Sequence, residues 1–376
     1  MAPDPMPTRT PHRAEDALAR AVLERNLGLR RGETLTIETW THALPWARSF
    51  VVEARRRGAR PTLIVEDESA FFRSIELLGS AAVSRASERL ASSSDAHVYF
   101  GGPEAFPRLL GLPADDVERL IERPGRTRRP GRPRFRGIRL AIGDVTPTAA
   151  ARYGVDLAAW QSELLRASLV DPARLEATGR SFARRLAGAR QLRIRHRNGT
   201  ELTLGLAARP PAVISGRQGR RARAAWDRVP SGIAIFPIRP GTADGVWETN
   251  RPAYDRFALP HTVVGGRFHF HDGRLTEFEF DRGGEGFVAA YARAGRGRER
   301  PVALTIGLNP EVRRAPEVLE LGRGTLGILL GDAPNARSGT RPGFSFLATL
   351  AGAEIGVDGR SWRPRGRRGA PVRGVG

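Results

Sequence analysis

The first half of the chain alternates short apolar runs with stretches of helical periodicity. Residues 33–40 (ETLTIETW), 61–67 (PTLIVED) and 97–102 (HVYFGG) have the β-branched and aromatic content of strands. Between the first two runs, apolar residues recur at helical spacing over residues 44–57. This order predicts an open α/β sheet, and the continuous apolar centre of 61–67 predicts a strand that is covered on both faces.

The second half has a different pattern. Two helices are expected over residues 156–188, where apolar residues keep helical spacing and Asp171-Pro172 is a typical helix start. From Gln191 onward, short alternating runs are separated by tight turns, and Asn198-Gly199 between two such runs predicts a hairpin. We therefore expect an N-terminal open α/β domain that is followed by a C-terminal mixed, mostly antiparallel β domain.

The length of 376 residues agrees with two domains, because one hydrophobic core seldom serves a chain of this size. The α/β domain is expected over 14–189, with the two helices at 156–188 as a bridge, and the β-rich domain over 190–362. Residues 1–13 and the basic tail 363–376 are expected to be disordered. No apolar run is long enough to span a membrane and no signal-peptide pattern begins the chain, so we expect a cytoplasmic protein without membrane contact.

The charge is strongly positive, at +21, and the 61 basic residues are all arginine because the chain has no lysine. Without lysine and cysteine, Schiff-base chemistry, P-loop phosphate binding, disulfides and thiolate metal sites are excluded. The arginines gather at 123–139, which is predicted to be a loop, at 217–223 and in the tail. Proline and glycine interrupt the first and last runs and few aromatic residues accompany them, so weak nucleic-acid binding is an alternative and not the leading prediction.

Segments spread over residues 14–362 keep a recognisable order: LRRGETLTIETW, EARRRGARPTLIVEDE, AIGDVTPTAAARYGVDLAAWQSELLRASLVD, NGTELTLGLAAR, VPSGIAIFPIRPGTADGV, IGLNP, and LGILLGDAPN with VDGR. In this order the chain resembles the aminopeptidase T family of metal-dependent leucyl aminopeptidases. Relatives of that family include non-haem iron ring-cleaving dioxygenases. The resemblance implies the two-domain fold, a site for two divalent ions in the second domain, and a homodimer.

The resemblance also implies where the metal ligands of the family would lie, and this chain departs from the family there. The family has carboxylates and histidines at the positions that are held here by Ile233, Ala303, Gly327, Ser345 and Leu347. These side chains are apolar or too small to hold a divalent ion in place of its water ligands. We therefore expect no metal, no cofactor and no catalytic residue at these positions. The leading hypothesis is a non-catalytic or repurposed protein that binds a peptide, a small molecule or a protein partner.

Four polar residues are the candidates for ligand binding: Asp332 and Asn309, which the resemblance places among the conserved turns of the scaffold, and Asp244 and His261. Asp332 before Ala-Pro is also typical of a turn. The second hypothesis is an enzyme, an aminopeptidase or another hydrolase or dioxygenase, that uses these residues in a rebuilt site within the same cleft. Asp244 and Glu248, four residues apart, have the types needed for acid/base chemistry.

Other patterns have both a functional and a structural interpretation. His269 and His271 lie two apart on a predicted strand and would suit a metal, but the pattern also fits the exposed face of a hairpin that turns at Asp272-Gly273. Residues 322–327 (GRGTLG) match the spacing of a dinucleotide-binding loop, yet the apolar run that follows predicts a strand, where such a site needs a helix. Gly101-Gly102 is expected to be a plain turn. Ser231 has no histidine next to it in the sequence, so it could serve as a nucleophile only through spatial neighbours.

Overall fold

The computed structural model describes residues 13–79, 93–111, 136–218, 225–253, 262–332 and 343–362. The chain forms two compact units. The first comprises residues 1–103, 123–144 and 218–226, and the second comprises residues 104–122, 145–217 and 227–376. The two helices predicted over 156–188 thus belong to the same unit as the β-rich part of the chain.

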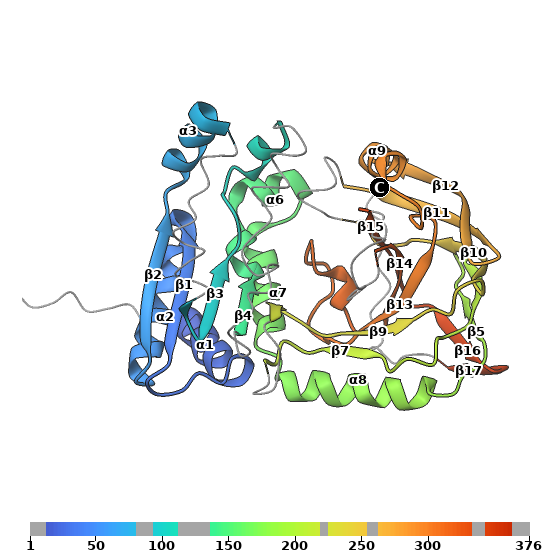
Figure 1. Cartoon of the computed structure of the whole chain (residues 1–376), viewed down its shortest axis with the longest axis horizontal. Helices are drawn as coiled ribbons and strands as arrows, with labels where there is room; N and C mark the ends of the chain where they lie inside the picture. The colour runs from blue at the N-terminus through green and yellow to red at the C-terminus, as the bar shows by residue number, and fades with distance from the viewer. Residues whose placement is uncertain are drawn as a thin grey trace, which may run out of the picture. The chain divides into compact units, whose positions relative to one another are not determined.

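A parallel sheet with helices forms the first unit (Figure 1). Its strand order is β2-β1-β3-β4, and β8, which leads from this unit into the second, lies next to β4. Helix α2 packs on β1 and β2, and α1 packs on α2. The elements are α1 (Arg13–Ala21), η1 (Val22–Asn26), β1 (Thr34–Trp40), η2 (Thr41–Ala43), α2 (Leu44–Arg56), β2 (Arg60–Glu66), α3 (Glu68–Leu78), β3 (Ala96–Phe100), β4 (Arg136–Leu140), η5 (Ala141–Asp144) and β8 (Ala225–Val229).

Two predictions about this sheet were wrong. Residues 136–139 of the arginine-rich loop predicted over 123–139 are not a loop, because Arg136–Leu140 forms β4 and pairs in parallel with β3. The strand predicted at 61–67 exists as β2, but it lies at the edge of the sheet, and Leu63 and Val65 are 37% and 44% exposed. A continuous apolar run therefore does not require cover on both faces. Residues 123–135 of the predicted loop lie outside the described residues.

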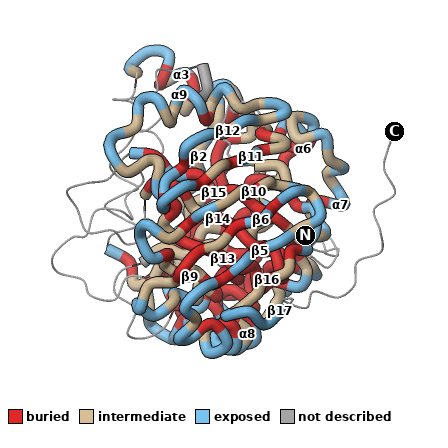
Figure 2. The backbone as a smooth tube through the Cα atoms, turned by 90° about the vertical axis from the view of Figure 1, so that its right-hand side faces the viewer, coloured by how far each residue is buried: buried red, intermediate tan, exposed pale blue. Residues whose placement is uncertain are grey.

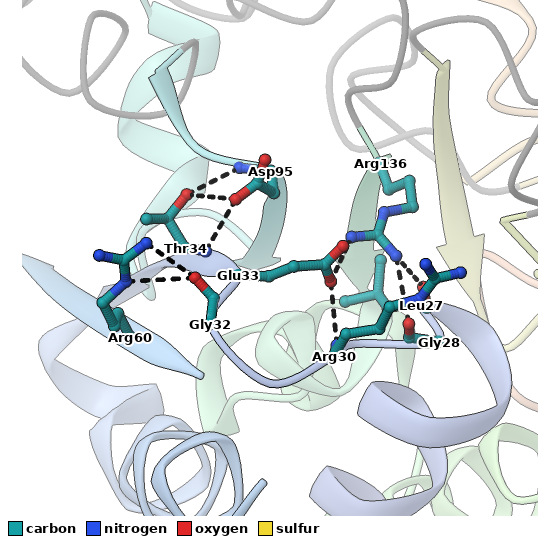
Figure 3. A network of polar contacts seen from close by, with 9 residues as sticks. All are labelled: Leu27, Gly28, Arg30, Gly32, Glu33, Thr34, Arg60, Asp95 and Arg136. Carbon is teal, nitrogen blue, oxygen red and sulfur yellow. Dashed lines mark hydrogen bonds and ion pairs between the residues drawn. The ribbon is translucent and has the colours of Figure 1, made fainter. Parts of the chain in front are cut away.

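Polar contacts connect the amino ends of the parallel strands (Figure 3). The Arg136 guanidinium, at the start of β4, donates to the Glu33 carboxylate (2.7 Å) and to the carbonyl of Leu27 (2.7 Å). The Asp95 carboxylate, just before β3, accepts from the backbone N–H (2.9 Å) and the hydroxyl (2.8 Å) of Thr34 on β1. The Asp95 bonds join the neighbouring strands β3 and β1, and the Arg136 bonds connect the start of β4 to the chain before β1, on the far side of β3.

The second unit contains two antiparallel sheets, with orders β12-β11-β10-β6-β5-β16-β17 and β15-β14-β13-β9-β7. Its strands are β5 (Leu192–Arg195), β6 (Glu201–Leu204), β7 (Ala212–Ile214), β9 (Ile233–Pro237), β10 (Asp244–Glu248), β11 (Val264–His271), β12 (Arg274–Arg282), β13 (Pro301–Gly307), β14 (Thr325–Gly331), β15 (Ser345–Ala351), β16 (Glu354–Val357) and β17 (Arg360–Trp362). Its helices are η4 (Phe106–Gly111), α6 (Pro147–Tyr153), α7 (Leu157–Ser168), α8 (Pro172–Leu186), α9 (Glu285–Arg293) and η6 (Leu319–Leu321).

This arrangement confirms the predicted fold class, a parallel α/β part followed by antiparallel β sheets. The hairpin predicted at Asn198-Gly199 joins β5 and β6, which pair from Arg195 with Glu201 onward. Strand β14 begins at Thr325 within GRGTLG and continues to Gly331, so no helix follows the motif and the structural context of a dinucleotide-binding loop is absent there, as predicted. Asp171 begins α8, and its carboxylate accepts from the backbone N–H of Ala173 (2.9 Å).

One apolar core takes side chains from both sheets and from α8 and α9. Buried backbone runs along β13, β14 and β15 (Figure 2). Phe287 of α9 is 1% exposed and lies at the centre of an aromatic cluster. Its ring centroid is 4.8 Å from that of Phe346 and 4.9 Å from those of Phe278 and Phe280. Within the described parts of the chain, no helix is both long and apolar enough to cross a membrane.

Replacing Phe287 by Ala should lower the free energy of unfolding by about 3–5 kcal/mol, because the change removes a large buried ring and leaves a cavity. The neighbouring Val288 is 48% exposed and provides the control, since Val288→Ala should change the free energy by less than about 0.5 kcal/mol. Urea denaturation followed by far-UV circular dichroism measures both. Equal effects of the two substitutions would contradict the placement of Phe287 in the core.

Candidate functional site

Strand pairing in the β15-β14-β13-β9-β7 sheet decides which side chains share a face. Leu304 and Ile306 of β13 belong to the core, so Ala303, Thr305 and Gly307 lie on the opposite face. The partners of these three residues lie on that face too. They are Ile233, Ile235 and Pro237 of β9, Gly327 and Leu329 of β14, and through β14 also Ser345, Leu347 and Thr349 of β15. The five positions where the resemblance expects metal ligands therefore share one face, here called the distal face.

The distal face is closely packed where a metal ligand would be needed. An atom added to Gly327 at the Cβ position would lie 2.5 Å from Oγ1 of Thr305 and 2.8 Å from Cδ1 of Leu347. Ala303 and Ile233 are buried, and Thr305 is 3% exposed. An imidazole at position 327 would have to displace both neighbouring side chains.

The chemistry of the distal face does not suit a divalent ion. Strands β9, β13, β14 and β15, which are fully described, contain no Asp, Glu or His. The hydroxyl of Thr305 lies 3.4 Å from the carbonyl oxygen of Gly327, within the strand pair itself. A dication needs several oxygen or nitrogen ligands to replace its water shell, and these residues do not supply them.

Asn309 follows β13 and is fully buried. Its Nδ2 donates to the carbonyls of Ala167 (3.0 Å) and Ser231 (2.9 Å), and its Oδ1 accepts from the backbone N–H of Glu311 (3.0 Å). These bonds connect the end of β13 to α7 and to the turn before β9. They give the amide a structural role, and ligand binding by Asn309 stays a prediction that its contacts do not support.

Asp332 follows β14 and is partly buried. Its backbone N–H donates to the carbonyl of Phe344 (2.7 Å), which keeps the residue beside the start of β15. Its Oδ1 is buried and makes no hydrogen bond to any residue that the structure describes. A buried carboxylate oxygen normally has a partner, so Asp332 remains a candidate for ligand binding.

Asp244 lies in a different place from Asp332. The β10–β11 pairing and the turn after β11 bring Asp244 together with His271 and Asp272, and their ligand atoms lie within 4.8 Å of one another. Oδ2 of Asp244 is 3.0 Å from Nδ1 of His271. All three side chains are mostly exposed, at 60%, 72% and 85%. We call Asp244, His271 and Asp272 the turn cluster. The sequence pattern indicated Asp244 and His271 as two unrelated candidates, and it indicated Asp272 only as part of a turn.

The remaining candidates are dispersed. His261 lies outside the described residues. Glu248 forms an ion pair with Arg267 (3.1 Å) and is not part of the turn cluster that contains Asp244. The hydroxyl of Ser231 donates to the carbonyl of Ile214 (3.3 Å), which is a structural bond. His269 lies outward on β11 between the buried Phe268 and Phe270, as the hairpin interpretation predicted.

The turn after β3 packs closely against the chain after β4 in the first unit. Gly101, just after β3, has a φ of +54°, and an added Cβ would lie 2.5 Å from the carbonyl carbon of Gly143. His42, after β1, places its Nε2 2.9 Å from the carbonyl oxygen of Gly143. An open parallel sheet binds nucleotides in the crevice beyond the carboxyl ends of its strands. Here backbone and imidazole meet at that point, in agreement with a plain turn at Gly101-Gly102.

Asp227 of β8 is a titratable group that sequence reasoning missed. Burial raises the pKa of its carboxyl above the usual value of 3.8, although the carboxyl accepts a hydrogen bond from the backbone N–H of Arg228 (2.7 Å). Its environment could not be predicted from the local sequence, because a second backbone hydrogen bond comes from Gly216, eleven residues earlier in the chain, and partly offsets the effect of burial.

Replacing Asn309 by Ala should lower the free energy of unfolding by about 2–4 kcal/mol, because two buried carbonyls lose their donor. Asn250 is the control. It makes two similar bonds to the backbone of Ala351 but is exposed, so Asn250→Ala should cost less than about 1 kcal/mol. The comparison uses chemical denaturation. If both substitutions cost the same, the structural role of Asn309 is wrong.

Replacing Asp227 by Asn should raise stability near neutral pH. A raised pKa means that the folded state binds the proton more tightly, so the ionised carboxylate destabilises the fold above its folded pKa. The gain should disappear as the pH falls below the unfolded value of about 3.8, where wild type and variant are both neutral. Thermal unfolding of both proteins across this pH range measures the difference. A gain that persists at the lowest pH, or a loss at neutral pH, would contradict the burial effect.

Comparison with known proteins places the fold. No protein-family model matches the chain, and no curated protein gives a significant match. Among solved structures, wild-type AmpT from Thermus thermophilus is similar with a TM-score of 0.68 and 18% identity, over 94% of this chain and 98% of that chain. The 2,5-dihydroxypyridine dioxygenase from Pseudomonas putida KT2440 is similar with a TM-score of 0.58 and 12% identity, over 97% and 99% of the two chains. The chain therefore has the fold of AmpT and of this dioxygenase, with its α/β part and β part in the same order.

Proposed function

We propose that this chain is an AmpT-like protein without a dimetal centre on the distal face, and that it binds a peptide, a small molecule or a protein partner without catalysing metal-dependent hydrolysis. One observation carries the proposal. The five positions that the resemblance assigns to metal ligands lie on one face of one sheet, and none of them offers a carboxylate or an imidazole.

The absence of ligands at all five positions argues more strongly against a bound metal than the absence of one ligand would. A divalent ion gives up its water only where protein oxygens and nitrogens replace it, and a site with one missing ligand can still bind weakly. With apolar or small residues at all five positions and close packing at Gly327, neither the donors nor the space remain. The resemblance to metallo-aminopeptidases thus extends to the scaffold of the proposed binding protein and not to the reaction.

The second candidate function is a rebuilt enzyme, and the turn cluster favours it. Asp244, His271 and Asp272 bring two carboxylates and an imidazole together, and a first-row dication accepts such ligands. The high exposure of the three side chains argues for weak binding, because solvent water competes for the ion and does not leave a dry site for catalysis. We therefore place this candidate second.

A homodimer and a cytoplasmic location rest on the resemblance and on the sequence pattern. Weak nucleic-acid binding through the arginine-rich segments is the third candidate, but 123–135 and 363–376 lie outside the described residues. Such binding would show an affinity for nucleic acid that falls steeply as the salt concentration rises.

Metal analysis and a peptidase assay test the proposal together. After purification without chelators and exhaustive dialysis, the protein should hold less than about one tenth of an equivalent of zinc, cobalt, manganese or iron. It should release no N-terminal leucine from a leucyl peptide, with or without added metal. One or two equivalents of a tightly held metal, together with leucine release, would overturn it.

A variant that combines Asp244→Ala with His271→Ala separates the first two candidates. If the wild type binds metal and the variant does not, the turn cluster is the site and the second candidate replaces the first. If the variant keeps the metal and the activity, a dimetal centre exists elsewhere and both candidates are wrong. Both residues are exposed, so the variant should fold as the wild type does.

A further inference from the structure

A hollow of about 650 Å³ lies beside the loop that follows α9 in the second unit. It is lined by Arg274, Ala294, Gly295, Arg296, Arg298, Glu299 and Arg300. The lining residues include four arginines and one glutamate, so their net charge is +3. We call it the arginine hollow. It shares no residue with the distal face or with the turn cluster, so conclusions about it do not depend on the proposed function.

Glu299 holds the loop in shape. Its Oε2 accepts from the backbone N–H of Gly297 (3.1 Å), and its Oε1 accepts from Nη1 of Arg274 (2.7 Å). Its carbonyl accepts from the backbone N–H of Leu275 in β12 (2.7 Å). Gly297 has a φ of +96°, which favours glycine and allows the tight turn. The single carboxylate of the hollow is thus already used to fix the loop and one arginine.

Arg298 is anchored to the carboxyl end of α9. Its Nη1 donates to the carbonyls of Ala292 (3.2 Å) and Ala294 (2.8 Å) at the carboxyl end of α9. Its guanidinium lies over the ring of Tyr291, 4.8 Å from the centroid. A cation at this end of a helix also interacts favourably with the helix dipole. Arg298 is therefore oriented before any ligand arrives.

Arg296 and Arg300 complete the lining and are exposed. Arg300 approaches Glu299 only at 4.0 Å, and no carboxylate among the described residues lies within ion-pair distance of Arg296. The carbonyl of Arg300 accepts from the backbone N–H of Gly331 (3.0 Å), which ties the end of the loop to β14. The fixed backbone thus carries two guanidinium groups whose donors are largely available to a ligand.

We propose that the arginine hollow binds a small molecule with at least two phosphoryl charges, of the class of a nucleoside diphosphate. Guanidinium groups bind phosphoryl oxygens through two parallel hydrogen bonds, and arginines on a fixed loop lose little freedom on binding. The volume is within the range of small-molecule sites and exceeds that of a single phosphate. No aromatic side chain lines the hollow, which disfavours single-stranded nucleic acid as the ligand.

The high arginine content of the chain does not by itself explain the arginine hollow. Bias raises the number of arginines everywhere, and elsewhere many of them pair with carboxylates, as Arg136 does with Glu33 and Arg228 with Glu320. The arginine hollow differs because four arginines line one concave surface, and the single carboxylate among the lining residues is bonded to Gly297 and Arg274.

Isothermal titration calorimetry of the full chain with pyrophosphate and with ADP, at low salt, tests the proposal. We expect saturable binding with one equivalent of ligand. The double variant Arg296→Ser with Arg300→Ser should weaken binding at least about tenfold, because charge-assisted hydrogen bonds are lost. The control variant carries Arg282→Ser with Arg293→Ser. It removes the same charge from exposed positions of the same unit that do not line the hollow, and its affinity should stay within about twofold of the wild type.

Each outcome decides the proposal. If neither ligand binds, or if both double variants weaken binding equally, the proposal is wrong, and in the second case the attraction belongs to the net charge. Binding of ADP but not of pyrophosphate supports it and shows that the hollow also contacts the nucleoside. Binding of a single-stranded oligonucleotide without either small anion overturns it in favour of nucleic acid. Thermal unfolding confirms that the variants are folded.

Discussion

The alternation of side chains along β9, β13, β14 and β15 is the constraint on which the second unit depends. One face of these strands supplies Leu304, Ile306 and Ile328 to the core. A shift of one residue in any pairing would turn these side chains outward, so the register is firmly set by burial. The same register determines which residues lie on the distal face. Its residues can change in chemistry without a change in fold, as long as the core face stays apolar.

Residues outside the two faces have structural roles of their own. Asn309 is buried with its amide hydrogen-bonded, and its loss would leave carbonyls without partners, so the fold itself requires it. Carboxylates gathered at one place repel one another where no cation is bound, and strands β9, β13, β14 and β15 place none on the distal face. Gly327 lies between Thr305 and Leu347 as part of a packed surface. Packing of this kind stabilises the sheet and leaves little space for a larger side chain at position 327.

Much of the fold could be predicted because its signals are local. Asn198-Gly199 between alternating runs predicted a hairpin, and the apolar run before Asp332 predicted β14. The errors came where burial depends on distant chain. Strand β4 follows a run of arginine and proline and forms because β3 offers it a partner. The turn cluster could not be predicted as a unit, because Asp244 meets His271 only through cross-strand pairing.

The positive charge can be understood only residue by residue. Glu53 accepts from both Arg56 and Arg57, and these bonds, that of Arg56 first, lower the pKa of its carboxyl. Such arginines are neutralised locally and contribute to stability above the pKa of the unfolded carboxyl. With 61 arginines and 40 acidic residues, complete pairing is impossible, so the surplus has to lie on the surface. Most surplus cations on a convex surface are simply hydrated. In the arginine hollow, the Glu299 carboxylate is bonded to the backbone N–H of Gly297. The positive potential of the surrounding arginines therefore attracts anions, and in the proposal these arginines bind the ligand.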